Sequence, residues 1–326
     1  MDCSSLGKTM LYFVSKKFQN IIKNNKENKN KICELAAKEN SLNILKWARE
    51  NSCFWNQSTC INAAKNGNLE ILEWAHNNGC VWNSAACACA AKNGHLEVLK
   101  WLRQNNCPWD ITTCNSAAAN NHFETLKWAR NNGCDWDDNT YVKAAFNGHL
   151  KILMWLRKNN CPWNWKTFAG AALNGHLDII KWAHANSCKW NSSVLSCAAK
   201  NGHLEVIKWA RKNGCDWNEG TCTLAAENNH FELLKWAREN GCEWHNSTCE
   251  YAAMNGHLEV LKWLRCNGCN WDKNKCIESA TKNNHYETAE WIKNEKCHLF
   301  GELKDYILEV VDNYRMNQML TNLYEK

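Results

Sequence analysis

The stretch WDITTCNSAAANNHFETLKWARNNGC, residues 109–134, decides the fold because variants of it follow one another along most of the 326-residue chain. Its tryptophans belong to two series that advance in steps of 27 residues, with one inserted residue between Cys276 and Ala280. The first series is Trp47, Trp74, Trp101, Trp128, Trp155, Trp182, Trp209, Trp236, Trp263 and Trp291, and the second is Trp55, Trp82, Trp109, Trp136, Trp163, Trp190, Trp217, Trp244 and Trp271. Self-similarity at a fixed period is the signature of a repeat protein. We therefore expect ten copies of one unit.

Each copy is expected to form two short helices. Asp110 is a short polar acceptor in the place of an N-cap and predicts a first helix over residues 111–119. A second helix is predicted over residues 95–103 in the preceding copy, where apolar residues recur on adjoining turns. Gly or Asn then follows in the place of a left-handed cap, as at Gly79 and Asn106. Because helices of about nine residues are marginal alone, the copies must stack into an all-α solenoid.

Two motifs carry a resemblance to a known family. Asn-Gly-His-Leu-Glu-Val-Leu-Lys at residues 93–100 resembles the second-helix motif of ankyrin repeats, and Thr-x-Cys-x-x-Ala-Ala at residues 112–118 resembles the first-helix motif. The resemblance covers residues 31–298 and implies an ankyrin-like helical repeat solenoid. Ankyrin repeats typically have about 33 residues, so the loops are expected to be reduced and the projecting hairpin lost. The short variety resembles arrays encoded by giant DNA viruses.

Composition narrows the functional classes. The net charge of +6 arises from 39 basic and 33 acidic residues, a mixed surface that gives no reason to expect a nucleic-acid partner. The 21 cysteines come without a signal peptide, and no apolar run is long enough to cross a membrane. We therefore expect reduced thiols in the cytoplasm or nucleus, which is the host cytoplasm if the protein is viral. We expect a monomer with no cofactor.

Candidate partner-binding residues are those at variable positions of the first helices. Trp165 alone lies outside both tryptophan series, in the first turn of a first helix, where exposure for partner contact and incidental surface are both open readings. Phe146 and Leu173 follow the Ala-Ala pair in consecutive copies and form either an exposed apolar patch or extra core. The remaining candidates, at the same two kinds of position, are Ile111, Asp138 and Met254. The leading hypothesis is a protein-binding scaffold that uses this first-helix and loop face, not an enzyme.

Other repeated residues receive structural interpretations. The tryptophan series could stack bases or sugars, but their helical spacing favours core packing. Tyr141, Phe168 and Leu195 replace the first-helix cysteine and are expected in the core. Cys266-Asn-Gly-Cys269 lacks a second pair at zinc-finger spacing, so we expect no metal. The eight histidines of the Asn-Gly-His type are interpreted as hydrogen-bonding residues at the second-helix start.

The two ends lie outside the repeat. Residues 1–30 are expected to form an N-terminal cap, and residues 299–326, with apolar residues at helical spacing, a C-terminal capping helix. Residues 14–22 also resemble the closing part of an F-box, which implies an alternative function as substrate receptor of a cullin-type ubiquitin ligase. The possible adaptor-binding residues are Val14, Phe18, Ile21 and Ile22.

Overall fold

The computed structural model describes residues 29–295, and this part of the chain consists of twenty α-helices in ten consecutive pairs without a strand. The all-α repeat fold expected from the sequence is confirmed. No helix among the described residues is long and apolar enough to cross a membrane. The two expected end caps, and with them Val14, Phe18, Ile21 and Ile22, fall mainly or wholly outside the described residues.

The chain divides into two compact units, and the boundary in the sequence lies between Trp163 and Asn164. The helices of the first unit are α3 (Lys29–Lys38), α4 (Leu42–Glu50), α5 (Gln57–Lys65), α6 (Leu69–Asn77), α7 (Ser84–Lys92), α8 (Leu96–Gln104), α9 (Ile111–Ala119), α10 (Phe123–Asn131), α11 (Asp138–Phe146) and α12 (Leu150–Lys158). Those of the second are α13 (Lys166–Leu173), α14 (Leu177–Ala185), α15 (Ser193–Lys200), α16 (Leu204–Lys212), α17 (Glu219–Glu227), α18 (Phe231–Glu239), α19 (Ser247–Met254), α20 (Leu258–Cys266), α21 (Lys273–Lys282) and α22 (Tyr286–Asn294).

The ends of each helix follow from local chemistry. The side chain of Asp110 accepts a hydrogen bond from the backbone N–H of Thr112 at 2.9 Å, which satisfies one of the free donors at the start of α9. Where His245 replaces the acidic or amide residue, its Nδ1 accepts from the N–H of Ser247. The second helices end at a left-handed residue, for example Gly133 with φ +87° and Asn106 with φ +60°. The predicted caps are therefore confirmed.

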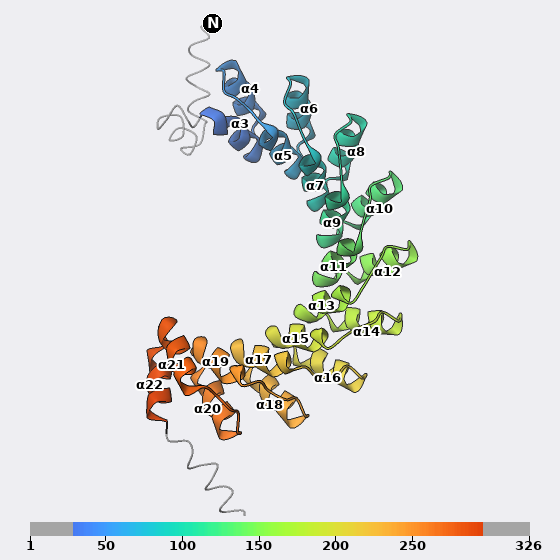
Figure 1. Cartoon of the computed structure of the whole chain (residues 1–326). Helices are drawn as coiled ribbons and strands as arrows, with labels where there is room; N and C mark the ends of the chain where they lie inside the picture. The colour runs from blue at the N-terminus through green and yellow to red at the C-terminus, as the bar shows by residue number, and fades with distance from the viewer. Residues whose placement is uncertain (1–28, 296–326) are drawn as a thin grey trace, which may run out of the picture. The chain divides into compact units, whose positions relative to one another are not determined.

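First helices build the continuous part of the core. In the first unit α5 packs against α7, α7 against α9 and α9 against α11, and Figure 1 shows these helices side by side in one row. Close approach is possible because the residues that face the neighbours are small: Ala117 and Ala118 of α9 are fully buried. The second unit repeats this arrangement from α13 to α21.

Second helices pack mainly on the first helix of their own pair. Thus α10 lies on α9 and α16 on α15, while Figure 1 shows the second helices as a separate outer row within each unit. Tyr141 and Phe168, which replace the first-helix cysteine, are fully buried between the rows, as is Leu195. The hydroxyl of Tyr141 donates to the Leu153 carbonyl oxygen at 2.8 Å, which gives this buried polar atom a partner. The core assignment of these three residues is confirmed.

Candidate binding surface

The loop that joins one pair of helices to the next is anchored by its tryptophan. The indole of Trp109 lies between two second helices: the Arg103 guanidinium of α8 is 4.3 Å from its centroid, and the Trp128 ring of α10 meets it edge-on at 5.9 Å. Both contacts are favoured by the ring quadrupole. The tryptophans of the two series are half-buried and lie outside the fully buried core. The expectation of core packing thus needs correction, because these rings fill the gaps between second helices at the surface.

The same arrangement recurs along both units. Arginine is replaced by histidine at two places, where the ring of His76 stacks on Trp82 at 3.8 Å and that of His184 on Trp190 at 4.4 Å. The other arginine–tryptophan pairs are Arg49–Trp55, Arg130–Trp136, Arg157–Trp163, Arg211–Trp217, Arg238–Trp244 and Arg265–Trp271.

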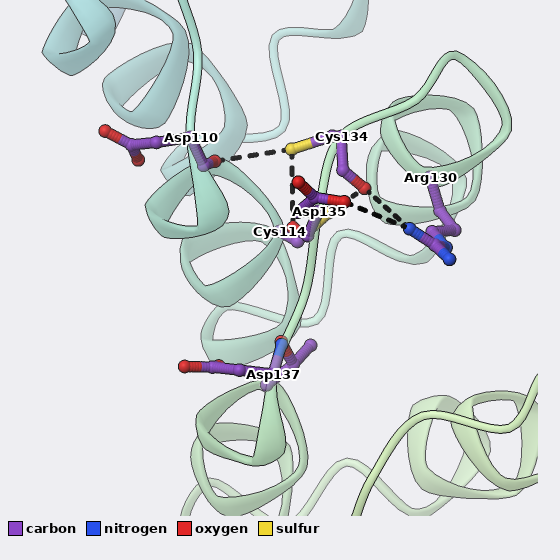
Figure 2. A network of polar contacts seen from close by, with 7 residues as sticks. Asp110, Cys114, Arg130, Cys134, Asp135 and Asp137 are labelled. Carbon is purple, nitrogen blue, oxygen red and sulfur yellow. Dashed lines mark hydrogen bonds and ion pairs between the residues drawn. The ribbon is translucent and has the colours of Figure 1, made fainter.

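The arginine also fixes the loop backbone. Figure 2 shows the Arg130 guanidinium donating to the carbonyl oxygen of Cys134 at 3.2 Å and approaching the exposed carboxylate of Asp135 at 3.8 Å. The buried cysteine of the loop then points inward and the tryptophan sideways. The middle residue of Cys-x-Trp, here Asp135, is therefore exposed on a loop whose backbone is held by the arginine.

In the first unit, the first three of these outward positions are apolar. Phe54 is 72% exposed and Val81 63% exposed, and Pro108 is exposed as well. Val81 lies between two shallow depressions, one of about 440 Å³ lined also by Trp55 and Gln57, and one of about 330 Å³ lined also by His76. Our sequence interpretation did not select these residues. The signal that could have found them is the middle position of Cys-x-Trp, which varies while its neighbours repeat.

The same outward position is polar in the second unit. It is occupied there by four exposed residues, Lys189, Asp216, Glu243 and Asn270. Asp135 of the first unit is also exposed and charged. The apolar character of the loop tips is therefore confined to the loops at residues 54, 81 and 108 and to Pro162, which is also exposed.

The predicted site residues occupy two opposite ends of the first helices. Ile111 and Asp138 are the first residues of α9 and α11, and Trp165 directly precedes α13. Phe146, Leu173 and Met254 are the last residues of α11, α13 and α19. At 1.5 Å per residue, the ends of such a helix are about 12 Å apart. The six residues therefore divide into an N-terminal and a C-terminal group, distributed over both units.

Exposure separates these candidates further. Trp165 is 44% exposed, Phe146 41% and Ile111 37%, whereas Asp138, Leu173 and Met254 are half-buried. The Leu173 carbonyl oxygen accepts hydrogen bonds from Asn201 and His203, so that end of α13 is partly covered by the next pair of helices. Ile111 adjoins the loop of Pro108, so it extends the apolar loop tips of the first unit.

The repeated histidines bind across repeats. His149 occupies the N-cap place of α12 without capping it, and its Nε2 lies 3.1 Å from the carbonyl oxygen of Ala119, thirty residues earlier. His95, His203, His230 and His257 make the same contact. The interpretation as hydrogen-bonding residues is correct, but the bond links neighbouring repeats instead of starting a helix.

Metal ligation finds no support in the described residues. No group of three or more His, Cys, Asp or Glu side chains between residues 29 and 295 could hold a metal ion. In the C-x-x-C pair Cys269 is buried and Cys266 is exposed. The two depressions beside Val81 are open and shallow.

Comparison with known proteins identifies the repeat. A family model described as ankyrin repeats in three copies matches residues 141–221 and 168–247, and one described as ankyrin repeats in many copies matches residues 86–130 and 249–292. The crystal structure of the human ASB11 ankyrin repeat domain is 18% identical, with a TM-score of 0.41, over 48% of this chain and 84% of that one. No curated protein matches the chain.

Proposed function

Because the chain contains ankyrin repeats, we propose that it is a protein–protein interaction scaffold whose partner binds the first turns of the first helices and the loops before them. The observation that carries this proposal is the exposure of large apolar side chains on loops whose backbone is fixed. Phe54 and Val81 are the most exposed of them in the first unit. The chain acts by binding and not by catalysis.

The small loss of conformational freedom on binding supports this choice of surface. An exposed apolar side chain on a rigid element loses little conformational freedom when it is covered by a partner, so most of its burial contributes to affinity. The Trp55 ring beside Phe54 is itself held by Arg49 at 4.1 Å and by Trp74 at 5.7 Å. The two depressions beside Val81 are places for apolar side chains of a partner.

The first unit can be tested by removing the apolar tips. Phe54→Ser with Val81→Ser is expected to weaken partner binding at least about tenfold, since each tip contributes more than about 1 kcal/mol in a binding centre. The measurement is quantitative affinity capture followed by titration of the purified partner. The matched control is Met154→Ser, an equally apolar change at a 53% exposed residue of second helix α12. Equal loss in the control and the double variant would place the partner elsewhere.

In the second unit Trp165 is the proposed contact residue. Exposed tryptophan is a frequent hot-spot residue, and Trp165 directly precedes α13, at the position that corresponds to Ile111 at the start of α9. Phe146 of the first unit and Leu173 and Met254 of the second are proposed contact residues at the opposite helix ends, and Asp138 of the first unit is one at the start of α11. Trp165→Ala should weaken binding without a change in thermal midpoint. Phe146→Ala tests the other end by the same titration.

The alternative function is that of a substrate receptor for a cullin-type ubiquitin ligase. Its support is the F-box-like sequence at Val14, Phe18, Ile21 and Ile22. Deletion of residues 1–28 would then abolish capture of a ligase adaptor while the partner of the repeat surface is retained. If the adaptor is captured equally without these residues, the receptor function is wrong.

The finer assignments belong to the same proposal. We infer a short-repeat variety of ankyrin array like those of giant DNA viruses, acting as a monomer on a host protein in the host cytoplasm or nucleus. The short repeat is supported by the spacing of the second helices, which begin at Leu69, Leu96, Phe123 and Leu150. Light scattering of the purified chain and microscopy of the tagged chain in host cells test these points.

A further inference from the structure

The loop tips of the first unit change from apolar to acidic along the row of first helices. The tips before α5, α7 and α9 are exposed apolar residues, called the apolar tips: Phe54, Val81 and Pro108. The tip before α11 is the exposed Asp135. The surface proposed for partner binding therefore has an apolar part over three repeats and a charged part at the fourth.

The N-caps of the same helices change in parallel. Asn56 and Asn83 cap α5 and α7 with neutral amides, whereas Asp110 and Asp137 cap α9 and α11 with carboxylates. Figure 2 shows both carboxylates on the same side of their helices, away from Arg130. The acidic end of the surface consists of Asp110, Asp135, Asp137 and Asp138.

The two cap carboxylates are the charges of this end that are best placed for a partner. Asp135 is 3.8 Å from the Arg130 guanidinium, which offsets one negative charge. Asp137 accepts hydrogen bonds from the backbone N–H and the side-chain amide of Asn139, and a carboxylate can accept further bonds beside these.

Tips and caps lie on one surface. The depression of about 440 Å³ is lined both by Asn56, the cap of α5, and by Val81, the tip of the next repeat. At the acidic end, the Cys134 sulfur lies 3.3 Å from the Asp110 carbonyl oxygen, so the loop that carries Asp135 adjoins the cap of α9. In both places a tip therefore lies beside the cap of the preceding repeat.

The spacing of the tips suits an α-helix. Packed helices are about 8–10 Å apart, and α5, α7, α9 and α11 pack in this order. Seven residues of a helix rise by about 10.5 Å and return to nearly the same face. Residues three apart on an extended strand span a similar distance, but they point to opposite faces. A polyproline II segment repeats its face about every 9.3 Å, but an α-helix, about 10–12 Å wide, covers the tips and the caps together.

We propose that the partner presents an amphipathic α-helix, with apolar side chains on the apolar tips and lysine or arginine side chains at the acidic end. This inference rests on the proposed scaffold function and names the kind of partner. The charges lie at one end of the surface alone, so they determine the direction of the helix: its basic end lies over α9 and α11 and its apolar part over α5 and α7. Complementary charges of this kind contribute specificity more than affinity.

The first test is selection from a displayed library of random peptides about 24 residues long, the length of a helix across four repeats. The bait is the folded full-length chain, and each enriched peptide is then titrated against the Phe54→Ser, Val81→Ser variant. Enriched peptides should share apolar residues at seven-residue spacing with lysine or arginine at one end, and circular dichroism should show a gain of helix on binding. Peptides that bind in an extended form with an apolar residue at every third position, or a selection without enrichment, would overturn the helical partner.

Removal of charge tests the acidic end separately. Asp110→Asn with Asp137→Asn removes two charges and keeps both caps, since Asn56 and Asn83 cap the equivalent helices. This variant should bind an enriched peptide about three- to tenfold more weakly at low salt, and the difference should disappear at high salt. The matched control is Asp272→Asn, at the exposed acidic cap of α21 in the second unit, with unchanged affinity.

The outcomes separate the kind of partner from the surface itself. Peptides that lose binding to the Phe54→Ser, Val81→Ser variant but bind the Asp110→Asn, Asp137→Asn variant normally would keep the scaffold surface and overturn the basic helix. Peptides unaffected by both variants would overturn the scaffold surface as well. Urea unfolding checks that both variants keep the midpoint of the unaltered chain, so that lost binding reflects the lost side chains.

Discussion

Each of the first nine repeats has two tight turns with a left-handed residue, and the turns differ in what lies over them. At the turn between the two helices, Gly202 has φ +76°, and a side chain there would begin 2.6 Å from the imidazole Nδ1 of His230 in the next repeat. At the turn after the second helix, Gly214 has φ +84° and nothing within 4 Å of that point. Both turns thus require the same backbone conformation, but only at the first turn does a residue of the next repeat lie against the glycine.

The sharpest way to test this difference is the pair of substitutions Gly202→Val and Gly214→Val. A β-branched residue is strained at positive φ by about 1–2 kcal/mol, so both variants lose this amount from the free energy of unfolding. Gly202→Val also displaces His230 and should cost about 3 kcal/mol or more in total, since overpacking adds about 1–3 kcal/mol. Urea unfolding measures the free energies. Equal losses would show that the next repeat does not press on the first turn.

A smaller effect is expected when the covering residue is removed. His230→Ala loses the hydrogen bond between Nε2 and the Lys200 carbonyl oxygen at 3.1 Å, with a cost of about 1–1.5 kcal/mol in the free energy of unfolding. The control is His230→Asn, because Asn68 holds the same place in an earlier repeat and caps its own helix by accepting from the N–H of Ile71. If the asparagine variant is as unstable as the alanine variant, the N-cap does not offset the lost bond.

The smallest effect is expected at the open turn. Gly214→Asn should change the free energy of unfolding by less than about 0.5 kcal/mol, because asparagine tolerates the left-handed region and no neighbour is displaced. Asn106 and Asn160 already occupy this place with φ +60° and +56°. Thermal unfolding of the purified variant is the measurement. A loss above 1 kcal/mol would mean that the open turn is constrained by something other than its backbone.

The features that could be predicted from the sequence are those governed by local rules. Caps, turn chemistry and periodicity predict the range of the first helix after Asp110, the left-handed residues after the second helices, and the burial of Tyr141 and Phe168. The positions of the tryptophans and histidines could not be derived in this way. Their contacts join separate elements, Trp109 of the loop before α9 with Trp128 of α10 and His149 with Ala119 of the preceding repeat, and periodicity does not say which faces meet.

The candidate surface was predictable only in part. The exposure of Trp165 is in keeping with its variable position. That Ile111 and Phe146 lie at opposite helix ends could have been worked out from helix geometry, since each is a terminal residue of its helix. Phe54 and Val81 needed the structure, because their outward direction depends on the inward cysteine and the arginine that holds the loop. Polar or apolar character alone did not distinguish a loop tip from the core.

The contacts of His149 have a consequence for how the chain folds while it is being made. Its imidazole binds a carbonyl oxygen thirty residues earlier, and Trp109 completes its packing only when Trp128 arrives. A repeat that has just left the ribosome therefore lacks the side chains of the next repeat that will cover its turn and its loop. Folding of the nascent chain therefore lags synthesis by one repeat, because each new repeat supplies the contacts that complete the one before it.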